Sequence, residues 1–96
     1  MENIGEIIYN LLKKKGLERR VYEYRVCKAW KDIVGEGIAR RVKAVYCRDG
    51  ILYLYSTDSL MRSEIYNLRK EIIKKINDFF NRKIVKDLKF TYKREI

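Results

Sequence analysis

The chain has 96 residues, 47% of them hydrophobic, so we expect a single domain, residues 1–96, that folds around one core. Lys and Arg number 23 against 13 Asp and Glu, which gives a formal net charge of +10 and favours a polyanionic partner. The absence of His excludes His-based catalytic triads and His-containing metal sites.

Two helices are predicted in the first third of the chain. A helix over about residues 3–15, capped by Asn3 and ended by Gly16, is indicated by helical spacing of Ile4, Ile7, Ile8, Leu11 and Leu12. A second helix runs from Leu17 to about Gly35, with an apolar stripe through Leu17, Val21, Tyr24, Cys27, Trp30, Ile33 and Val34. We expect Trp30 in the core, with a partner for its indole N–H. After the joint at residues 35–37, Ile38 and Ala39 should lead into extended chain.

A β-hairpin is predicted between Arg40 and Ser56. The spacing of apolar residues there changes to every second residue, and Asp49–Gly50 supplies a two-residue turn. The next helix starts at Thr57 or Asp58 and ends near Asn81, with its apolar face on Met61, Ile65, Leu68, Ile72, Ile76 and Phe79. A last strand carries Ile84, Leu88, Phe90 and Tyr92.

The predicted fold class is α+β, with the order α-α-β-β-α-β and a three-stranded sheet that has helices on one face. The third strand should lie parallel to one of the first two. The helix-covered face would contain Val42, Ala44, Tyr46, Leu52, Leu54, Leu88, Phe90 and Tyr92. The open face would contain Arg41, Lys43, Tyr53, Tyr55, Lys89, Thr91 and Lys93.

The open face has two interpretations. Tyrosines among Lys and Arg suit single-stranded nucleic acid, because bases stack on rings while cations bind phosphates, and Tyr53 and Tyr55 are the candidate rings. The alternative is that these tyrosines only reflect the strand propensity of Tyr. Likewise, the charged content of 38% is typical of heat-adapted proteins, although heat adaptation does not explain the positive excess.

A second set of cations lies at the joints of the chain, where a small fold could bring them together. It consists of Lys13, Lys14, Lys15, Arg19, Arg20, Arg40 and Arg41. The three lysines either balance the dipole of the first helix or bind phosphate. The set would serve an acidic protein as well as nucleic acid, and the sequence does not decide between them.

The remaining residues argue against an enzyme. The Ser and Thr hydroxyls lack a His base, and the phosphate-binding Gly motifs are absent, so we predict no catalysis, no cofactor and no small-molecule substrate. Cys27 and Cys47 do not form a C-x-x-C motif and are interpreted as buried thiols. A secretory signal and long apolar runs are both missing, so we expect a soluble cytosolic protein without a membrane partner.

Three segments together resemble one known family. Ala29–Gly35 resembles an a-W-x-x-I-V-G signature, Asp49–Ser56 a G-x-L-x-V-x-S strand, and Glu64–Asn77 an E-L-x-x-L-x-x-x-L-L-x-x-L-N helix. They are similar to the DciA-like proteins, whose better-known members act on the bacterial replicative helicase DnaB. The resemblance implies a KH-like fold, contact with DnaB and an affinity for DNA. The G-x-x-G loop with which KH domains clamp RNA is absent.

Our leading hypothesis is a non-enzymatic accessory protein of replication that binds single-stranded or double-stranded DNA and recruits or loads DnaB. One alternative is a protein-interaction module whose basic surface binds an acidic partner and not DNA. Another is an RNA-binding protein with a KH-like sheet.

Overall fold

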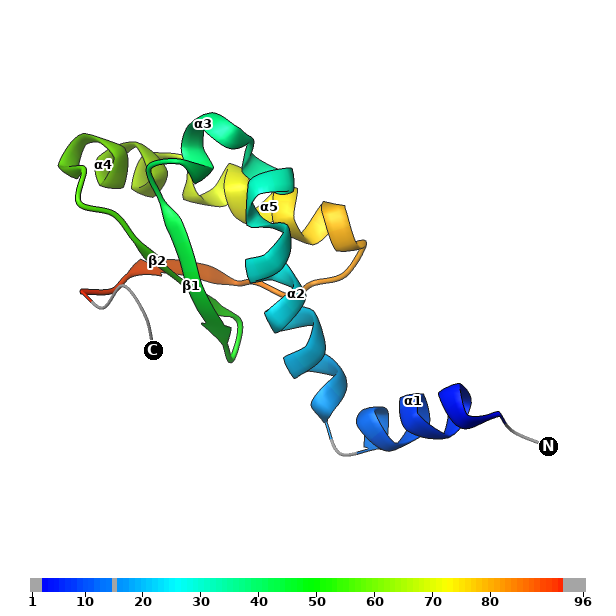
Figure 1. Cartoon of the computed structure of the whole chain (residues 1–96). Helices are drawn as coiled ribbons and strands as arrows, with labels where there is room; N and C mark the ends of the chain where they lie inside the picture. Colours follow the sequence, from blue (N-terminus) through cyan, green and yellow to red (C-terminus); the bar gives the residue numbers. More distant parts are fainter. Residues whose placement is uncertain (1–2, 15, 93–96) are drawn as a thin grey trace.

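The computed structural model describes residues 3–14 and 16–92 and has the predicted α+β fold. Its elements are α1 (Ile4–Lys14), α2 (Leu17–Val34), α3 (Glu36–Ala39), β1 (Lys43–Arg48), β2 (Ile51–Tyr55), α4 (Ser59–Asn67), α5 (Arg69–Phe80) and β3 (Asp87–Phe90). The three strands form one sheet with β2 at its centre, and α2 and α5 pack against that sheet (Figure 1). Within the described residues, no helix is long and apolar enough to cross a membrane.

The predicted hairpin is confirmed. β1 and β2 pair antiparallel, and the turn between them has a φ of +54° at Asp49 and +81° at Gly50. Two-residue hairpins favour positive φ at both central positions because the turn then matches the twist of the strands. A Cβ atom at Gly50 would also lie 3.0 Å from Cγ of Lys86, so both the backbone and the available space favour glycine there.

The hairpin turn is held by α2 and by the segment that enters β3. The Gly50 N–H donates to Oε2 of the buried Glu23 at 2.8 Å. The Gly50 carbonyl oxygen accepts the N–H groups of Lys86 at 2.7 Å and Asp87 at 3.2 Å. β3 then runs parallel to β2, which is one of the two pairings that the sequence predicts.

A β-bulge in β1 corrects the predicted faces of the sheet. The pairing register shifts between Ala44, which opposes Leu54, and Tyr46, which opposes Tyr53. The extra residue, Val45, changes the alternation along β1. Tyr46 therefore shares the open face with Tyr53, and its predicted place beneath the helices is wrong.

Tyr92 is a second correction to the predicted faces. Its side chain is fully exposed instead of packing under the helices. The reason is that β3 ends at Phe90, so the alternation of strand residues does not reach position 92.

The core lies between the sheet and helices α2 and α5. Its buried residues are Val26, Trp30, Ile33, Val42, Leu52, Leu54, Ile65, Ile72, Ile76, Ile84, Val85 and Leu88. Trp30 is buried as predicted, and its indole Nε1–H donates to the carbonyl oxygen of Val42 at 2.9 Å. This bond joins the last turns of α2 to the residue that precedes β1.

The predicted apolar stripe of α2 is wrong in its first half. Val21 and Tyr24 are exposed, whereas Glu23 and Val26 are buried. The Gly50 N–H gives the Glu23 carboxylate a hydrogen bond, so this charged residue can lie on the buried face of α2, which the apolar pattern does not indicate.

The single helix predicted after the hairpin is divided into α4 and α5. Its ends agree with the prediction, since Asp58 caps the start and Asn81 ends it with a φ of +52°. At Leu68 the ψ angle is +10°, far from the usual helical value, so the helix kinks there. Its hydrogen bonds nevertheless continue, from the Leu68 N–H to Glu64 at 3.0 Å and from the Ile72 N–H to Leu68 at 2.9 Å.

Two further expectations concern the ends of α2. Ile38 and Ala39 are not extended but close the short helix α3, because Gly35, with a φ of +93°, ends α2 and a new helical turn follows. At the other end, α1 projects away from the body at the start of α2 (Figure 1). It leaves Ile4, Ile7 and Ile8 exposed, so α1 does not join the helices that cover the sheet.

Candidate nucleic-acid interface

The open face of the sheet carries tyrosines and lysines in rows across the strands. Tyr46, Tyr53 and Lys89 lie opposite one another on β1, β2 and β3, and Lys43 and Tyr55 form the next row. The rings of Tyr46 and Tyr53 stack, with centroids 4.4 Å apart and planes inclined by 14°. The three tyrosines are half-buried and both lysines are exposed. The prediction that Lys43, Tyr53, Tyr55 and Lys89 share this face is confirmed.

A basic hollow of about 440 Å³ lies beside this face, where β1 begins and β2 ends. It is lined by Ala39, Arg40, Arg41, Lys43, Tyr55, Ser56 and Thr57, and so joins four of the predicted site residues. Arg40 pairs with Glu36 and Arg41 with Asp58, each at 3.5 Å and with exposed guanidinium groups. Exposed pairs of this kind are weak, so both guanidinium groups can turn toward another anion.

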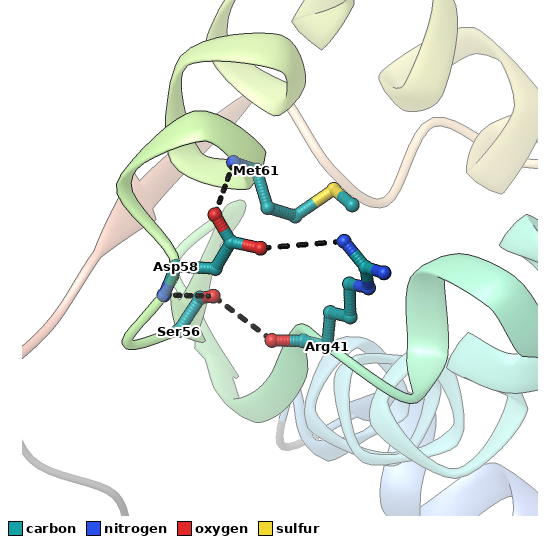
Figure 2. Close-up of polar contacts among 4 residues, drawn as sticks. All are labelled: Arg41, Ser56, Asp58 and Met61. Atoms are coloured by element: carbon teal, nitrogen blue, oxygen red, sulfur yellow. Dashed lines mark hydrogen bonds and ion pairs between the residues drawn. The ribbon is translucent and has the colours of Figure 1, made fainter.

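The backbone below Arg41 is fixed by a hydrogen-bonded corner, shown in Figure 2. Ser56 Oγ donates to the Arg41 carbonyl oxygen at 2.9 Å and accepts the Asp58 N–H at 3.1 Å. Asp58 in turn accepts the Met61 N–H at 3.1 Å and so caps α4. Arg62 closes the corner by donating to the Ser56 carbonyl oxygen at 2.7 Å. The corner therefore presents exposed, weakly paired cationic side chains from a hydrogen-bonded backbone.

The fold does not bring the two predicted arginine pairs together. Arg19 and Arg20 lie near the start of α2, and Arg40 and Arg41 lie beyond its end. The 18 residues of α2 correspond to about 27 Å at 1.5 Å per residue. Arg19 instead pairs with Asp49 of the hairpin turn at 3.4 Å.

Two of the predicted site residues, Lys15 and Lys93, lie outside the described residues. Lys13 and Lys14 form the last turn of α1, and their side chains are likewise outside the description. Both interpretations of these lysines therefore stay predictions.

A second hollow, between α2 and β1, contains residues that the sequence predictions omitted. It has a volume of about 630 Å³. Its lining includes Arg20, Tyr24 and Lys28 from α2 and Lys43, Tyr46 and Arg48 from β1. The sequence does contain a signal that Tyr46 lies on the open face. A two-residue turn at Asp49–Gly50 pairs position 48 with 51 and therefore position 46 with 53, which places Tyr46 beside Tyr53. No comparable signal in the sequence indicates that the side chains of α2 and β1 line one hollow.

Cys27 and Cys47 also line this second hollow and are half-buried rather than fully buried. Burial raises the pKa of Cys27 to about 11 and that of Cys47 to about 12, and the Glu23 carboxylate adds to both shifts. Cys47 Sγ lies 3.9 Å from Oε2 of Glu23, to which it donates. Both thiols are therefore uncharged near neutral pH. Among the residues that the structure describes, no cluster of three or more His, Cys, Asp or Glu could hold a metal ion.

Two comparisons with known proteins relate this chain to a family. A family profile described as "Dna[CI] antecedent, DciA" matches residues 3–90. A UPF0232 protein of Rhodococcus jostii (strain RHA1) is 28% identical over 87 residues, which are 91% of this chain and 46% of that protein. The chain thus spans about half the length of this curated relative. Since the profile match extends from before α1 to the end of β3, the chain belongs to the DciA family.

Proposed function

We propose that this protein is a non-enzymatic, DNA-binding accessory protein of replication that recruits or loads the replicative helicase DnaB. Membership of the DciA family supports the helicase role. The row formed by the stacked rings of Tyr46 and Tyr53 with Lys89, on a chain of net charge +10, is the observation that carries the DNA-binding role.

The open face can hold a single strand by two physical effects. Tyrosine rings provide a surface on which bases stack, at about 1–3 kcal/mol per base, with little dependence on sequence. Lys43, Lys89 and the arginines of the basic hollow neutralise phosphates and release counterions. The interface therefore binds DNA without reading its sequence.

A separate surface suits a protein partner. Leu60, Tyr66 and Leu68 of the α4 region and Phe79 of α5 are exposed. Large apolar side chains exposed on surface helices are suited to contact with a protein partner. We assign the helicase contact to these helices, which leaves the open sheet face to DNA.

DNA binding is tested by fluorescence anisotropy with a labelled single-stranded oligonucleotide over a series of NaCl concentrations. The logarithm of the association constant should fall linearly with that of the salt concentration, by about 0.7 per phosphate contact. The open-face variant Tyr53→Ala/Lys89→Glu should bind more weakly. Its matched control is Tyr66→Ala/Lys70→Glu, which makes the same two replacements on exposed positions of α4 and α5. No binding at low salt, or equal loss in both variants, contradicts the proposal.

The helicase role is tested by retention of purified DnaB from the same organism on the immobilised protein. We expect retention by the native protein and weaker retention by the variant Leu60→Ser/Phe79→Ser. Failure of the native protein to retain DnaB contradicts this part of the proposal.

Parallel titrations with RNA and heparin test whether the protein prefers DNA. Equal affinity for DNA, RNA and heparin would indicate charge attraction alone.

A further inference from the structure

The hollow between α2 and β1 has one wall formed by α2 and one formed by β1. Along both walls the side chains follow the same order of types: arginine, tyrosine, lysine. On α2, Arg20, Tyr24 and Lys28 are spaced by four residues, so they lie on one face of the helix. On β1 the order is Arg48, Tyr46 and Lys43.

The two walls run in register. Arg19, the neighbour of Arg20, pairs with Asp49, the neighbour of Arg48, at 3.4 Å. The arginines therefore lie at the hairpin end of the hollow and the lysines at its other end. Each wall presents a cation, a tyrosine and a cation along the same direction.

We propose that this α2–β1 groove holds one strand of nucleic acid, with bases against Tyr24 and Tyr46 and phosphates at the cations on either side of them. The inference rests on the proposed DNA-binding function and adds a second contact site to the open face. Tyr46 connects the two sites, because its ring stacks on Tyr53 of the open face and also lines the groove.

The electrostatics of the groove suit a phosphate chain. Among the residues that the structure describes, four cations line it, and the one acidic lining residue, Glu23, is 3% exposed and accepts the Gly50 N–H. The thiols of Cys27 and Cys47 add no negative charge, because burial raises the pKa of both. The cations at both ends of both walls therefore attract a phosphate chain.

The rings distinguish nucleic acid from an acidic peptide, which the cations alone would also attract. Tyr24 is 62% exposed, and the Lys28 ammonium lies 5.4 Å from its ring centroid. A ring beside a cation fits a base and its neighbouring phosphate, whereas a carboxylate chain gains little from the ring. The volume of about 630 Å³ is that of a small-ligand pocket, which holds a short stretch of one strand and not a duplex.

The test compares two variants that each change the net charge by four units. Arg20→Glu/Lys28→Glu alters the groove, and Lys70→Glu/Lys75→Glu alters exposed positions of α5 away from it. We expect the groove variant to lose about tenfold in affinity for a single-stranded oligonucleotide near physiological salt, with a shallower salt dependence, and the control to lose clearly less. Equal losses would overturn the inference, and circular dichroism verifies that both variants are folded.

The outcomes separate this inference from the proposed function. If the native protein does not bind the oligonucleotide, the proposed function fails. If it binds, and only Tyr53→Ala/Lys89→Glu weakens binding, the proposed function stands and the groove inference is overturned. A groove variant that keeps its DNA affinity but loses affinity for a polyglutamate peptide overturns the inference in favour of an acidic partner.

A second measurement needs no substitution. Cys27 and Cys47 line the groove, so a saturating oligonucleotide should slow alkylation of both thiols in the native protein severalfold. An unchanged alkylation rate with DNA bound would overturn the inference.

Discussion

Replacing Glu23 with Ala tests how the buried carboxylate holds the hairpin turn. Glu23 is 3% exposed, and its Oε2 accepts the Gly50 N–H at 2.8 Å. In Glu23→Ala this N–H, on a residue that is itself buried, loses its partner. A buried donor without a partner costs about 1–3 kcal/mol, and a hydrogen bond to a charged group contributes about 1.5–3 kcal/mol. Because the variant also removes the penalty for burying a charge, we expect a loss of about 2 kcal/mol in the free energy of unfolding.

The assay is urea unfolding followed by the fluorescence of Trp30, the only tryptophan of the chain and a core residue. For a domain of this size, about 2 kcal/mol corresponds to a fall in melting temperature of roughly 10 °C. Glu23→Gln keeps an acceptor oxygen for the Gly50 N–H, so its loss should be smaller than that of Glu23→Ala.

Glu64→Ala is the control, because it changes the net charge equally at an exposed position of α4. Its effect should stay within about 0.5 kcal/mol. The reasoning is refuted if Glu23→Ala destabilises the protein no more than Glu64→Ala does. If Glu23→Gln and Glu23→Ala lose the same free energy, the negative charge matters and the hydrogen bond does not.

Three other expectations concern stability and thiol chemistry. Trp30→Phe removes a buried indole hydrogen bond of 2.9 Å and should lower the free energy of unfolding by about 1–3 kcal/mol, measured by far-ultraviolet circular dichroism in urea. Gly50→Ala, at a φ of +81° and with its Cβ 3.0 Å from a lysine side chain, should lower that free energy by about 1–2 kcal/mol in thermal unfolding. Cys27 and Cys47, with pKa values raised to about 11 and about 12, should react with iodoacetamide at pH 8 more slowly than in unfolded protein. Their rates should rise above pH 10, Cys27 first; full reactivity at pH 8 would contradict the raised pKa.

Local signals in the sequence are sufficient for the order of the main elements, apart from α3 and the division between α4 and α5, and for several ends of elements. The Asp49–Gly50 turn needs only two residues that tolerate positive φ, and both have it. Asn3 caps α1 by accepting the Glu6 N–H at 2.8 Å, and Asp58 caps α4. Such features depend on a few neighbouring residues, so a sequence can reveal them.

Features that depend on distant residues were not predictable in the same way. The burial of Glu23 requires the Gly50 N–H of a turn 27 residues further along the chain. The periodicity of α2 alone therefore predicts that Tyr24 lies in the core, whereas in the structure Tyr24 is exposed. The separation of Arg19 from Arg40, in contrast, could have been predicted from the sequence. The predicted length of the second helix alone is enough to keep these two arginines apart.

The candidate site shows the same division. Tyr53 and Tyr55 alternate with buried leucines along β2, so their shared face follows from strand geometry alone. Tyr46 was misplaced because alternation from Ala44 onward puts it beneath the helices. The bulge at Val45, which the apolar pattern does not indicate, reverses that assignment.

The bulge also explains how one strand serves both the core and the proposed DNA contacts. Ala44 faces the core opposite Leu54, while Tyr46 faces outward opposite Tyr53. In a regular strand, residues 44 and 46 would share a face, so keeping Tyr46 outward would move Ala44 out of the core and turn Lys43 into it. Burying the charge of a lysine costs far more than one irregular pair of strand residues. The extra residue Val45 therefore keeps Lys43 and Tyr46 on the surface together, and β1 can present a cation and a ring to one strand of DNA without loss of the core beneath it.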